Sequence, residues 1–307
     1  MKKVAVEQIQ TYTGHKGAVF ALCADEAGDH FYSAGDDGVV VRWPLDATQQ
    51  SGEGMLKIER AIYALAVIHE KNQLWVGASD GKIYVVHTLS RELLITLSSH
   101  TKAIYNLSYD AETQQMWALG GKGWLSLIEV NTFTISHTQQ LHTENLRSLA
   151  FHMDQVFIGG SDHCIYQLPK EKPGLATHKW KAHSRSVFSL LIHPEAHYLL
   201  SGGMDAQLAV WDLKQEYRLI RKIPAHYFTV NDLALSPSND YFMTASRDKT
   251  LKLWDAYQFE LLKVIDFPRN KGHKFSVNKI LWLKVDNSVI SGSDDKRIIR
   301  WIINTSV

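Results

Sequence analysis

The feature that most constrains this chain is a unit of about 43 residues that recurs seven times. A turn marks each unit. An aspartate occupies the same position of this turn in six units, and Lys122 takes its place in the third. The positions are Asp37, Asp80, Lys122, Asp162, Asp205, Asp248 and Asp295, in steps of 43, 42, 40, 43, 43 and 47 residues. A large apolar residue follows six positions later, at Trp43, Val86, Ile128, Leu168, Trp211, Trp254 and Trp301. A period of this length predicts a repeat architecture, which has to be identified before any site.

Each unit predicts four short β-strands, because four β-rich runs are separated by Gly, Asp, Asn or Pro turns. One such sheet cannot bury both of its faces, so neighbouring sheets must stack. Radial stacking leaves only short, protected edges. No apolar period of 3.6 residues persists, so we expect almost no helix. The sequence therefore predicts an all-β fold, a seven-bladed β-propeller of four-stranded antiparallel blades, with residues 1–307 as one domain.

The ends of the chain predict how the ring closes. The last unit lacks its outermost strand, because only residues 302–307 follow Trp301. A β-rich run at residues 4–11 precedes the first unit and has no place within it. We therefore expect residues 4–11 to pair with the last unit.

Composition narrows the function classes. The net charge of +1 produces no strong field, which argues against nucleic acid and anionic membranes as partners. Two cysteines form neither a disulfide framework nor a zinc pattern, and no run is long and apolar enough for a membrane helix or a signal peptide. We expect a cytoplasmic or nuclear protein that does not bind membranes.

The pairs Gly14-His15, Gly272-His273, Trp211-Asp212 and Trp254-Asp255 resemble those of WD-repeat β-propellers, and the resemblance covers the whole chain. It implies a platform for other proteins, without catalysis. It also implies that the turn Asp accepts a hydrogen bond from a His, and that a Ser or Thr links this His to the Trp. Complete sets are His15/Ser33/Asp37/Trp43, His183/Ser201/Asp205/Trp211, His226/Thr244/Asp248/Trp254 and His273/Ser291/Asp295/Trp301.

Units two to four depart from this pattern. Val76, Ala118 and Ile158 replace the Ser or Thr, and Val86, Ile128 and Leu168 replace the Trp. Because the two positions change together, these units are coherently apolar at both positions, which should avoid a half-satisfied polar network.

Catalysis finds little support in the sequence. The histidines and aspartates repeat around a ring and do not converge, and no nucleophile elbow, phosphate loop or zinc-protease motif occurs. Asn106, Asn231, Asp232 and Asn278 lie near the expected axis, but no Glu accompanies them. His193 and His197 are expected to face solvent in a turn. We predict no metal and no cofactor; the alternative is a propeller enzyme or small-molecule binder at the channel mouth.

One column of residues predicts a binding site. It follows the first apolar residue of each inner strand and reads Phe20, Tyr63, Tyr105, Arg147, Phe188, Asn231 and Asn278. The resemblance places this column at the mouth of the central channel, on the face of the histidine loops, which we call the His-loop face. The four aromatic rings favour a cation or an apolar side chain of an extended peptide. Alternatively, they pack on one another and plug the channel.

A second set of charged and adaptable residues is expected on the same face. Asp36 and Asp294 could grip a Lys or Arg of a partner, and Met204 stands at the equivalent turn position. Arg147, Arg185 and Arg247 could form a basic arc that holds a carboxylate or phosphate. Residues 267–271 form a loop expected to project from this face. The ordinary alternative is that these are scattered surface charges. We predict a monomer that binds another protein or peptide.

Overall fold

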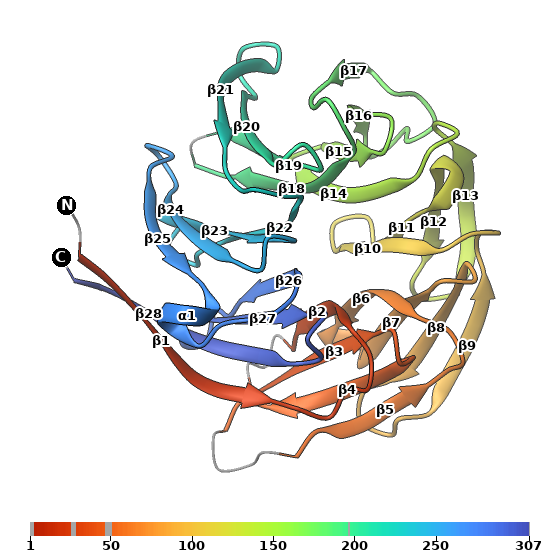
Figure 1. Cartoon of the computed structure of the whole chain (residues 1–307). Coiled ribbons are helices and arrows are strands. Elements are labelled where there is room, and N and C mark those ends of the chain that lie inside the picture. Colours follow the sequence, from red (N-terminus) through yellow and green to blue (C-terminus); the bar gives the residue numbers. More distant parts are fainter. Residues whose placement is uncertain (1–2, 26–28, 47–50, 196, 307) are drawn as a thin grey trace.

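The computed structural model describes residues 3–25, 29–46, 51–195 and 197–306, which form seven four-stranded antiparallel sheets. Figure 1 shows these sheets arranged radially around a central channel. Each sheet is called a blade and is numbered in chain order, and its strands run from the channel outward. The predicted fold, an all-β seven-bladed propeller, is confirmed.

The first three blades follow one another along the chain. Blade one consists of β2 (Val19–Ala24), β3 (His30–Gly35), β4 (Val39–Pro44) and β5 (Glu53–Lys57). Blade two consists of β6 (Ile62–Ile68), β7 (Gln73–Ala78), β8 (Lys82–His87) and β9 (Leu93–Ser98). Blade three consists of β10 (Ile104–Asp110), β11 (Gln115–Gly120), β12 (Trp124–Glu129) and β13 (Thr134–Gln140).

The remaining blades continue the ring. Blade four consists of β14 (Leu146–His152), β15 (Gln155–Gly160), β16 (Cys164–Pro169) and β17 (His178–Lys181). Blade five consists of β18 (Val187–His193), β19 (Tyr198–Gly203), β20 (Gln207–Asp212) and β21 (Arg218–Pro224). Blade six consists of β22 (Val230–Leu235), β23 (Tyr241–Ser246), β24 (Leu251–Asp255) and β25 (Leu261–Ile265). Blade seven consists of β26 (Val277–Trp282), β27 (Ser288–Ser293), β28 (Ile298–Ser306) and β1 (Lys3–Tyr12).

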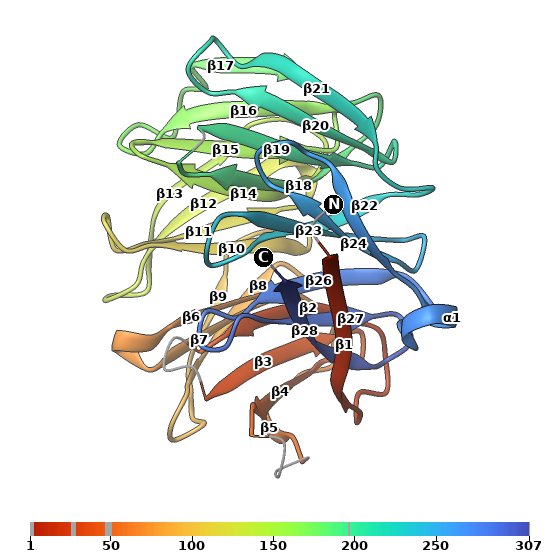
Figure 2. The same ribbon diagram turned by 90° about the vertical axis from the view of Figure 1, so that its left-hand side faces the viewer.

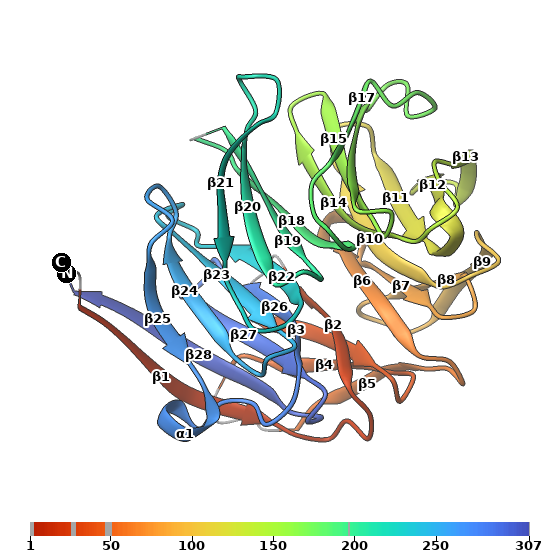
Figure 3. The same cartoon turned by 45° about the horizontal axis from the view of Figure 1, so that its top comes forward.

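The ring closes through the two ends of the chain, as predicted. β1 pairs antiparallel with β28 from Lys3 opposite Ser306 to Tyr12 opposite Ile298, with a bulge between Gln8 and Gln10. Figures 2 and 3 show these strands side by side at the edge of blade seven. β1 joins two cores, because Val6 packs with residues of blades six and seven and Tyr12 packs at the joint of blades seven and one.

The cores lie between the blades. The first apolar residue of every inner strand is fully buried, at Val19, Ile62, Ile104, Leu146, Val187, Val230 and Val277. Adjacent blades approach closely at these residues. A β-carbon on Gly202 would lie 2.7 Å from Cγ1 of Val230 in the next blade, so only a residue without a side chain leaves this spacing undisturbed.

Helical structure is confined to short turns in the described part of the chain. Two 3₁₀ turns, η1 (His69–Lys71) and η2 (Gly121–Gly123), and one short helix, α1 (Phe267–Asn270), are present. The expected loop at residues 267–271 thus contains one helical turn, because the side chain of Asp266 accepts a hydrogen bond from the amide of Arg269 at 3.0 Å. None of these turns has the length and apolarity that a bilayer crossing requires.

Candidate interaction site at the channel mouth

Four polar networks brace the ring in blades one, five, six and seven. In blade six, the His226 imidazole contacts the Asp248 carboxylate through Nδ1 at 2.8 Å and the Thr244 hydroxyl through Nε2 at 2.6 Å. The Trp254 indole donates to the same hydroxyl at 3.1 Å. The other three sets have the same arrangement. The predicted sets are therefore confirmed, and they lie in separate blades.

The electrostatics of the blade six network favour a neutral imidazole beside an ionised carboxylate. Burial works against ionisation of Asp248, but hydrogen bonds from His226, Thr250 and a backbone amide outweigh it and hold the pKa of this carboxyl well below its ordinary value. Burial lowers the pKa of His226. The proton then lies on Nδ1 and points at Asp248, while Nε2 accepts from Thr244. Every polar atom of the chain of bonds is satisfied, so the network stabilises the blade.

Blade three contradicts the expectation that the apolar replacements avoid a half-satisfied network. His100 remains buried, and its Nε2 lies 3.0 Å from the hydroxyl of Ser126, a residue outside the predicted column. Its Nδ1 has no hydrogen-bond partner within the described structure, because Lys122 stands where the turn Asp would be. Burial lowers the pKa of His100 to about 4. The network in this blade is half-satisfied.

Blade four keeps a polar network of another kind. The Asp162 carboxylate accepts a hydrogen bond from the Tyr166 hydroxyl at 2.6 Å and pairs with the Lys179 ammonium at 3.0 Å. His142 lies 3.6 Å from the same carboxylate. The tyrosine thus replaces the Ser-Trp part of the repeat, so blade four keeps a polar network although both positions of the pattern are apolar.

His193 and His197 do not face solvent as expected. His193 is completely buried, its Nε2 lies 3.0 Å from the carbonyl of Asn239, and its ring packs edge-on against Tyr257 of blade six. His197 is half-buried against His152, with ring centres 5.7 Å apart. Both histidines contribute to the packing between blades.

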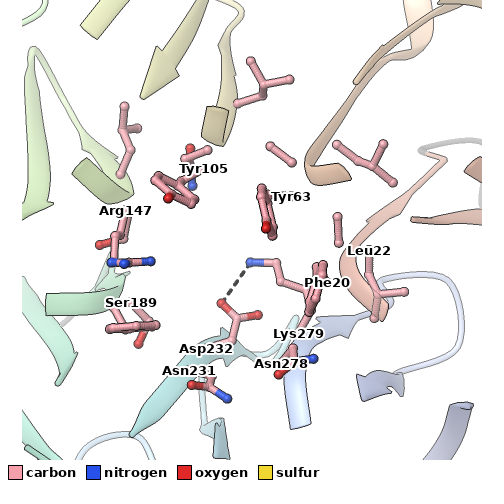
Figure 4. Close-up of a pocket in the computed structure, with 18 of the residues that line it drawn as sticks. Phe20, Leu22, Tyr63, Tyr105, Arg147, Ser189, Asn231, Asp232, Asn278 and Lys279 are labelled. Atoms are coloured by element: carbon pink, nitrogen blue, oxygen red, sulfur yellow. Dashed lines mark hydrogen bonds and ion pairs between the residues drawn. The ribbon is translucent and has the colours of Figure 1, made fainter. Parts of the chain in front are cut away.

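The predicted column lines a cavity of about 390 Å³ in the central channel (Figure 4). All seven members are half-buried, and they are joined in the cavity wall by Asn106, Asp232 and Lys279 among others. The inner strands place one member per blade because each strand has a bulge between its first and third residues, at the column position. The structure therefore brings Phe20, Tyr63, Tyr105, Arg147, Phe188, Asn231 and Asn278 together.

The aromatic members form a continuous arc along one side of the cavity. Ring centres lie 5.2 Å apart for Phe20 and Tyr63 and 5.5 Å apart for Tyr63 and Tyr105. The Arg147 guanidinium then lies 4.9 Å from the ring centre of Tyr105 and 4.5 Å from that of Phe188. The rings pack on one another, as the alternative expectation held, but they do not fill the cavity.

Arg147 changes the chemistry expected of this arc. The aromatic rings were expected to favour a cation or an apolar side chain of a partner, but the chain supplies a cation itself. The Nε of Arg147 donates to the Ser161 hydroxyl at 2.9 Å, and burial lowers the pKa of the guanidinium. Among the cavity-lining residues, which all belong to the described structure, Asp232 is the sole carboxylate, and it pairs with Lys279 at 2.9 Å. The positive charge of Arg147 is thus not balanced within the cavity wall.

The two asparagines of the column close the joints between blades. Asn231 donates to the Ser276 hydroxyl at 3.1 Å and to the Val277 carbonyl at 2.8 Å, both in blade seven or its preceding loop. Asn278 donates to the Val19 carbonyl in blade one at 3.0 Å and to the Asp294 carboxylate at 2.7 Å. Sequence reasoning placed these residues but missed their role, because it depends on contacts between different blades.

The second set of predicted residues lies outside the cavity lining. Asp36, Arg185, Arg247 and Asp294 are exposed on loops, and Met204 is half-buried. Arg147 lies between two aromatic rings in the channel wall, whereas Arg185 and Arg247 are exposed on loops, and the basic arc of these three residues stays a prediction. In the described residues, no group of three or more His, Cys, Asp or Glu side chains has an arrangement suited to a metal ion.

Comparison with known proteins agrees with this architecture. A sequence model of the WD40 repeat (WD domain, G-beta repeat) matches residues 6–43, 174–212, 217–255 and 263–301, which together make up half of the chain. The chain therefore belongs to the WD40 repeat family. The matched segments hold the four blades with a complete His-Asp network, and the unmatched blades are the three that depart from it.

Two kinds of relative define the resemblance more closely. Striatin from Homo sapiens is 24% identical over an alignment of 244 positions, which covers 71% of this chain and 31% of striatin. A striatin homolog from Dictyostelium discoideum is 24% identical over an alignment of 247 positions, which covers 69% of this chain and 30% of the homolog. The chain thus spans about a third of these relatives. The WD40 propeller domain of Doa1 superposes with a TM-score of 0.84 at 18% identity, over 97% of both chains. The family and these likenesses are consistent with a protein-interaction scaffold.

Proposed function

We propose that this propeller is a non-catalytic interaction platform that binds a segment of another protein at the channel mouth on its His-loop face. The observation that carries the proposal is the unbalanced guanidinium of Arg147, held between Tyr105 and Phe188 at the wall of an open cavity. Rings and a guanidinium at a concave surface are typical of binding sites dominated by a few anchor residues.

The bound segment should present a carboxylate to Arg147. A guanidinium has five N–H donors in a planar fork, and Ser161 accepts from only one of them. A carboxylate matches this fork with two parallel hydrogen bonds, whereas a cation would be repelled. The apolar part of the segment would then pack on the arc formed by Phe20, Tyr63 and Tyr105.

The test is removal of two anchors, Tyr105→Ala and Phe188→Ala, in one variant. A matched control carries Leu219→Ala and Ile220→Ala, which lie exposed on β21 at the outer edge of blade five. Proteins that co-purify with each form are quantified by mass spectrometry, after thermal unfolding shows that both variants fold. We expect partners of the wild type to be lost only with the channel variant. The same partners at the same levels on all three forms would remove this face from consideration.

The carboxylate is tested separately once a bound segment is in hand. Arg147→Met keeps the length and apolar packing of the side chain but removes its charge. We expect the affinity to fall about ten-fold or more for Arg147→Met. A segment that binds the Arg147→Met variant as tightly as the wild type would contradict the role of the guanidinium and leave the platform itself intact. We also propose a cytoplasmic monomer, to be checked by fluorescence microscopy and sedimentation.

A further inference from the structure

An unusual group of exposed aromatic residues lies on the His-loop face, outside the channel. Five aromatic side chains are strongly exposed in the described structure, and four of them come from only two inter-blade segments. Tyr227 is 89% exposed and Phe228 59%, before blade six, and Phe267 is 43% exposed and Phe275 56%, before blade seven. Exposed aromatic residues gathered in this way mark interaction surfaces in soluble proteins.

The fold does not require these rings. Phe228 and Phe275 occupy the second position after the loop histidine, and the other five blades carry Gly17, Arg60, Lys102, Glu144 and Arg185 at that position. Gly17 is buried, but the other four are exposed polar residues, so the position faces solvent. A phenylalanine at this position in two adjacent blades exposes apolar surface that the packing of the propeller does not bury.

The two segments that carry these aromatic residues meet at one hollow. The amide of Tyr227 donates to the Asp248 carboxylate at 3.0 Å. Asp248, Lys249, Phe267 and Lys274 line a common hollow of about 320 Å³ between blades six and seven. The ammonium of Lys274 lies 4.9 Å from the ring centre of Phe267. Phe267 and Lys274 therefore line a hollow large enough to admit a side chain, beside the segment that carries Tyr227.

The charges around this hollow are mostly positive and unpaired. Ion pairs hold Arg269 to Asp266 and Arg297 to Asp295. By contrast, none of the ion pairs found in the described residues involves Arg247, Lys249, Lys271 or Lys274, and all four residues are exposed. We call these four cations, together with Tyr227, Phe228, Phe267 and Phe275, the blade six–seven patch. A partner complementary to this patch is acidic and carries apolar side chains.

We infer that the blade six–seven patch is a second docking surface, which binds an acidic protein segment that inserts an aromatic or aliphatic side chain into the hollow between Lys249 and Phe267. Asn231 and Asn278, the channel-lining members from the same two blades, interrupt the aromatic arc. The patch uses none of the residues of the arc, so the two surfaces can be tested separately. The concave hollow favours a side chain of a protein segment over the flat surface of an anionic bilayer.

The probe is a phage-displayed library of random dodecapeptides, selected on the wild-type protein. Two variants remove the patch by different routes, Phe228→Ser with Phe275→Ser, and Lys249→Glu with Lys274→Glu. The matched control, Arg60→Ser with Lys102→Ser, changes the same exposed loop position in blades two and three. We expect enriched peptides that combine Asp or Glu with Trp, Phe or Leu. They should bind both patch variants about ten-fold or more weaker than the control, and bind less tightly as salt is raised.

Several outcomes would overturn the inference. Selected peptides without acidic residues, or peptides that bind both patch variants as well as the wild type, would do so. So would sedimentation with phosphatidylserine vesicles that the patch variants abolish, or wild-type dimers that dissociate in those variants. Peptides lost only in the Tyr105→Ala/Phe188→Ala variant would support the channel mouth and contradict the patch, so the two proposals fail separately.

Discussion

At the scale of single residues, the Asp248 carboxylate is the point on which the network of blade six depends. It accepts hydrogen bonds from His226 at 2.8 Å, Thr250 at 2.6 Å and the amide of Tyr227 at 3.0 Å. Asp248→Ala should lower the free energy of unfolding by about 2–4 kcal/mol, because it strands the buried His226 Nδ1. Urea denaturation measures this loss, with the exposed Asp36→Ala as control. A loss below about 0.5 kcal/mol would show that the network does not stabilise the blade.

His100 gives the stability of the fold a dependence on pH. Its pKa is about 4 in the folded protein, against about 6.5 in an unfolded chain. The unfolded state therefore binds the proton first, so stability is full above about pH 6.5 and falls as the pH drops toward 4. In His100→Gln, which cannot titrate at this position, this loss in the free energy of unfolding, up to about 3 kcal/mol, should disappear. Urea denaturation across this pH range measures it, and parallel slopes for the two proteins would contradict the assignment.

Arg147 illustrates what a repeat column can and cannot predict. The column correctly placed seven residues at one cavity, because the bulge at the start of each inner strand repeats with the sequence. It did not predict that the guanidinium turns between Tyr105 and Phe188, because that orientation depends on residues contributed by neighbouring blades. Of the partner chemistries that the sequence left open, the position of Arg147 disfavours a cation and supports the proposed carboxylate.

At the scale of the blade, the distance to the next blade is set by small residues near the end of the second strand. A β-carbon at Gly202 would lie 2.9 Å from Cβ of Val230, an atom fixed to the backbone. Gly202→Val should therefore lower the free energy of unfolding by about 1–3 kcal/mol through overpacking. Gly54→Val is the control, since no atom lies within 4 Å of a β-carbon at that edge position. Equal midpoints in urea for the two variants would mean that the blades can separate at little cost.

The strands were predictable to within a residue or two, whereas contacts between blades were not. The run at residues 4–11 was expected to pair with the last unit, and the observed strand covers Lys3–Tyr12. His193 was expected in a solvated turn, but β18 extends to include it and carries the imidazole beneath Tyr257 of the next blade. Local sequence defines a strand, while burial of its last residue depends on a partner about 60 residues away.

At the scale of the whole molecule, the ring is closed by one strand pair, β1 with β28. Ala5 and Asn304 lie opposite each other in that pair, and both side chains are exposed. Directly opposite residues in an antiparallel ladder point to the same face at a spacing suited to a disulfide. The Ala5→Cys/Asn304→Cys variant, once oxidised, should melt at a higher temperature. The cross-link restricts the unfolded chain and should raise the free energy of unfolding by at most about 5 kcal/mol.

Calorimetry of the same variant before and after reduction provides the control, because only the cross-link differs. Since β1 contributes Val6 and Tyr12 to two cores, its release should open the ring and expose both. If the oxidised and reduced forms melt at the same temperature, separation of β1 from β28 is not the step that limits stability.

The closing pair also determines how the molecule responds to a mechanical load. Lys3 lies opposite Ser306, so both termini leave from the same end of an antiparallel ladder. A force that pulls the termini apart would break the hydrogen bonds of this ladder one after another, as a zipper opens, and would not load them in parallel. A tether attached at the two ends would therefore peel the ring open at low tension, even though the same ring resists denaturant through seven packed joints.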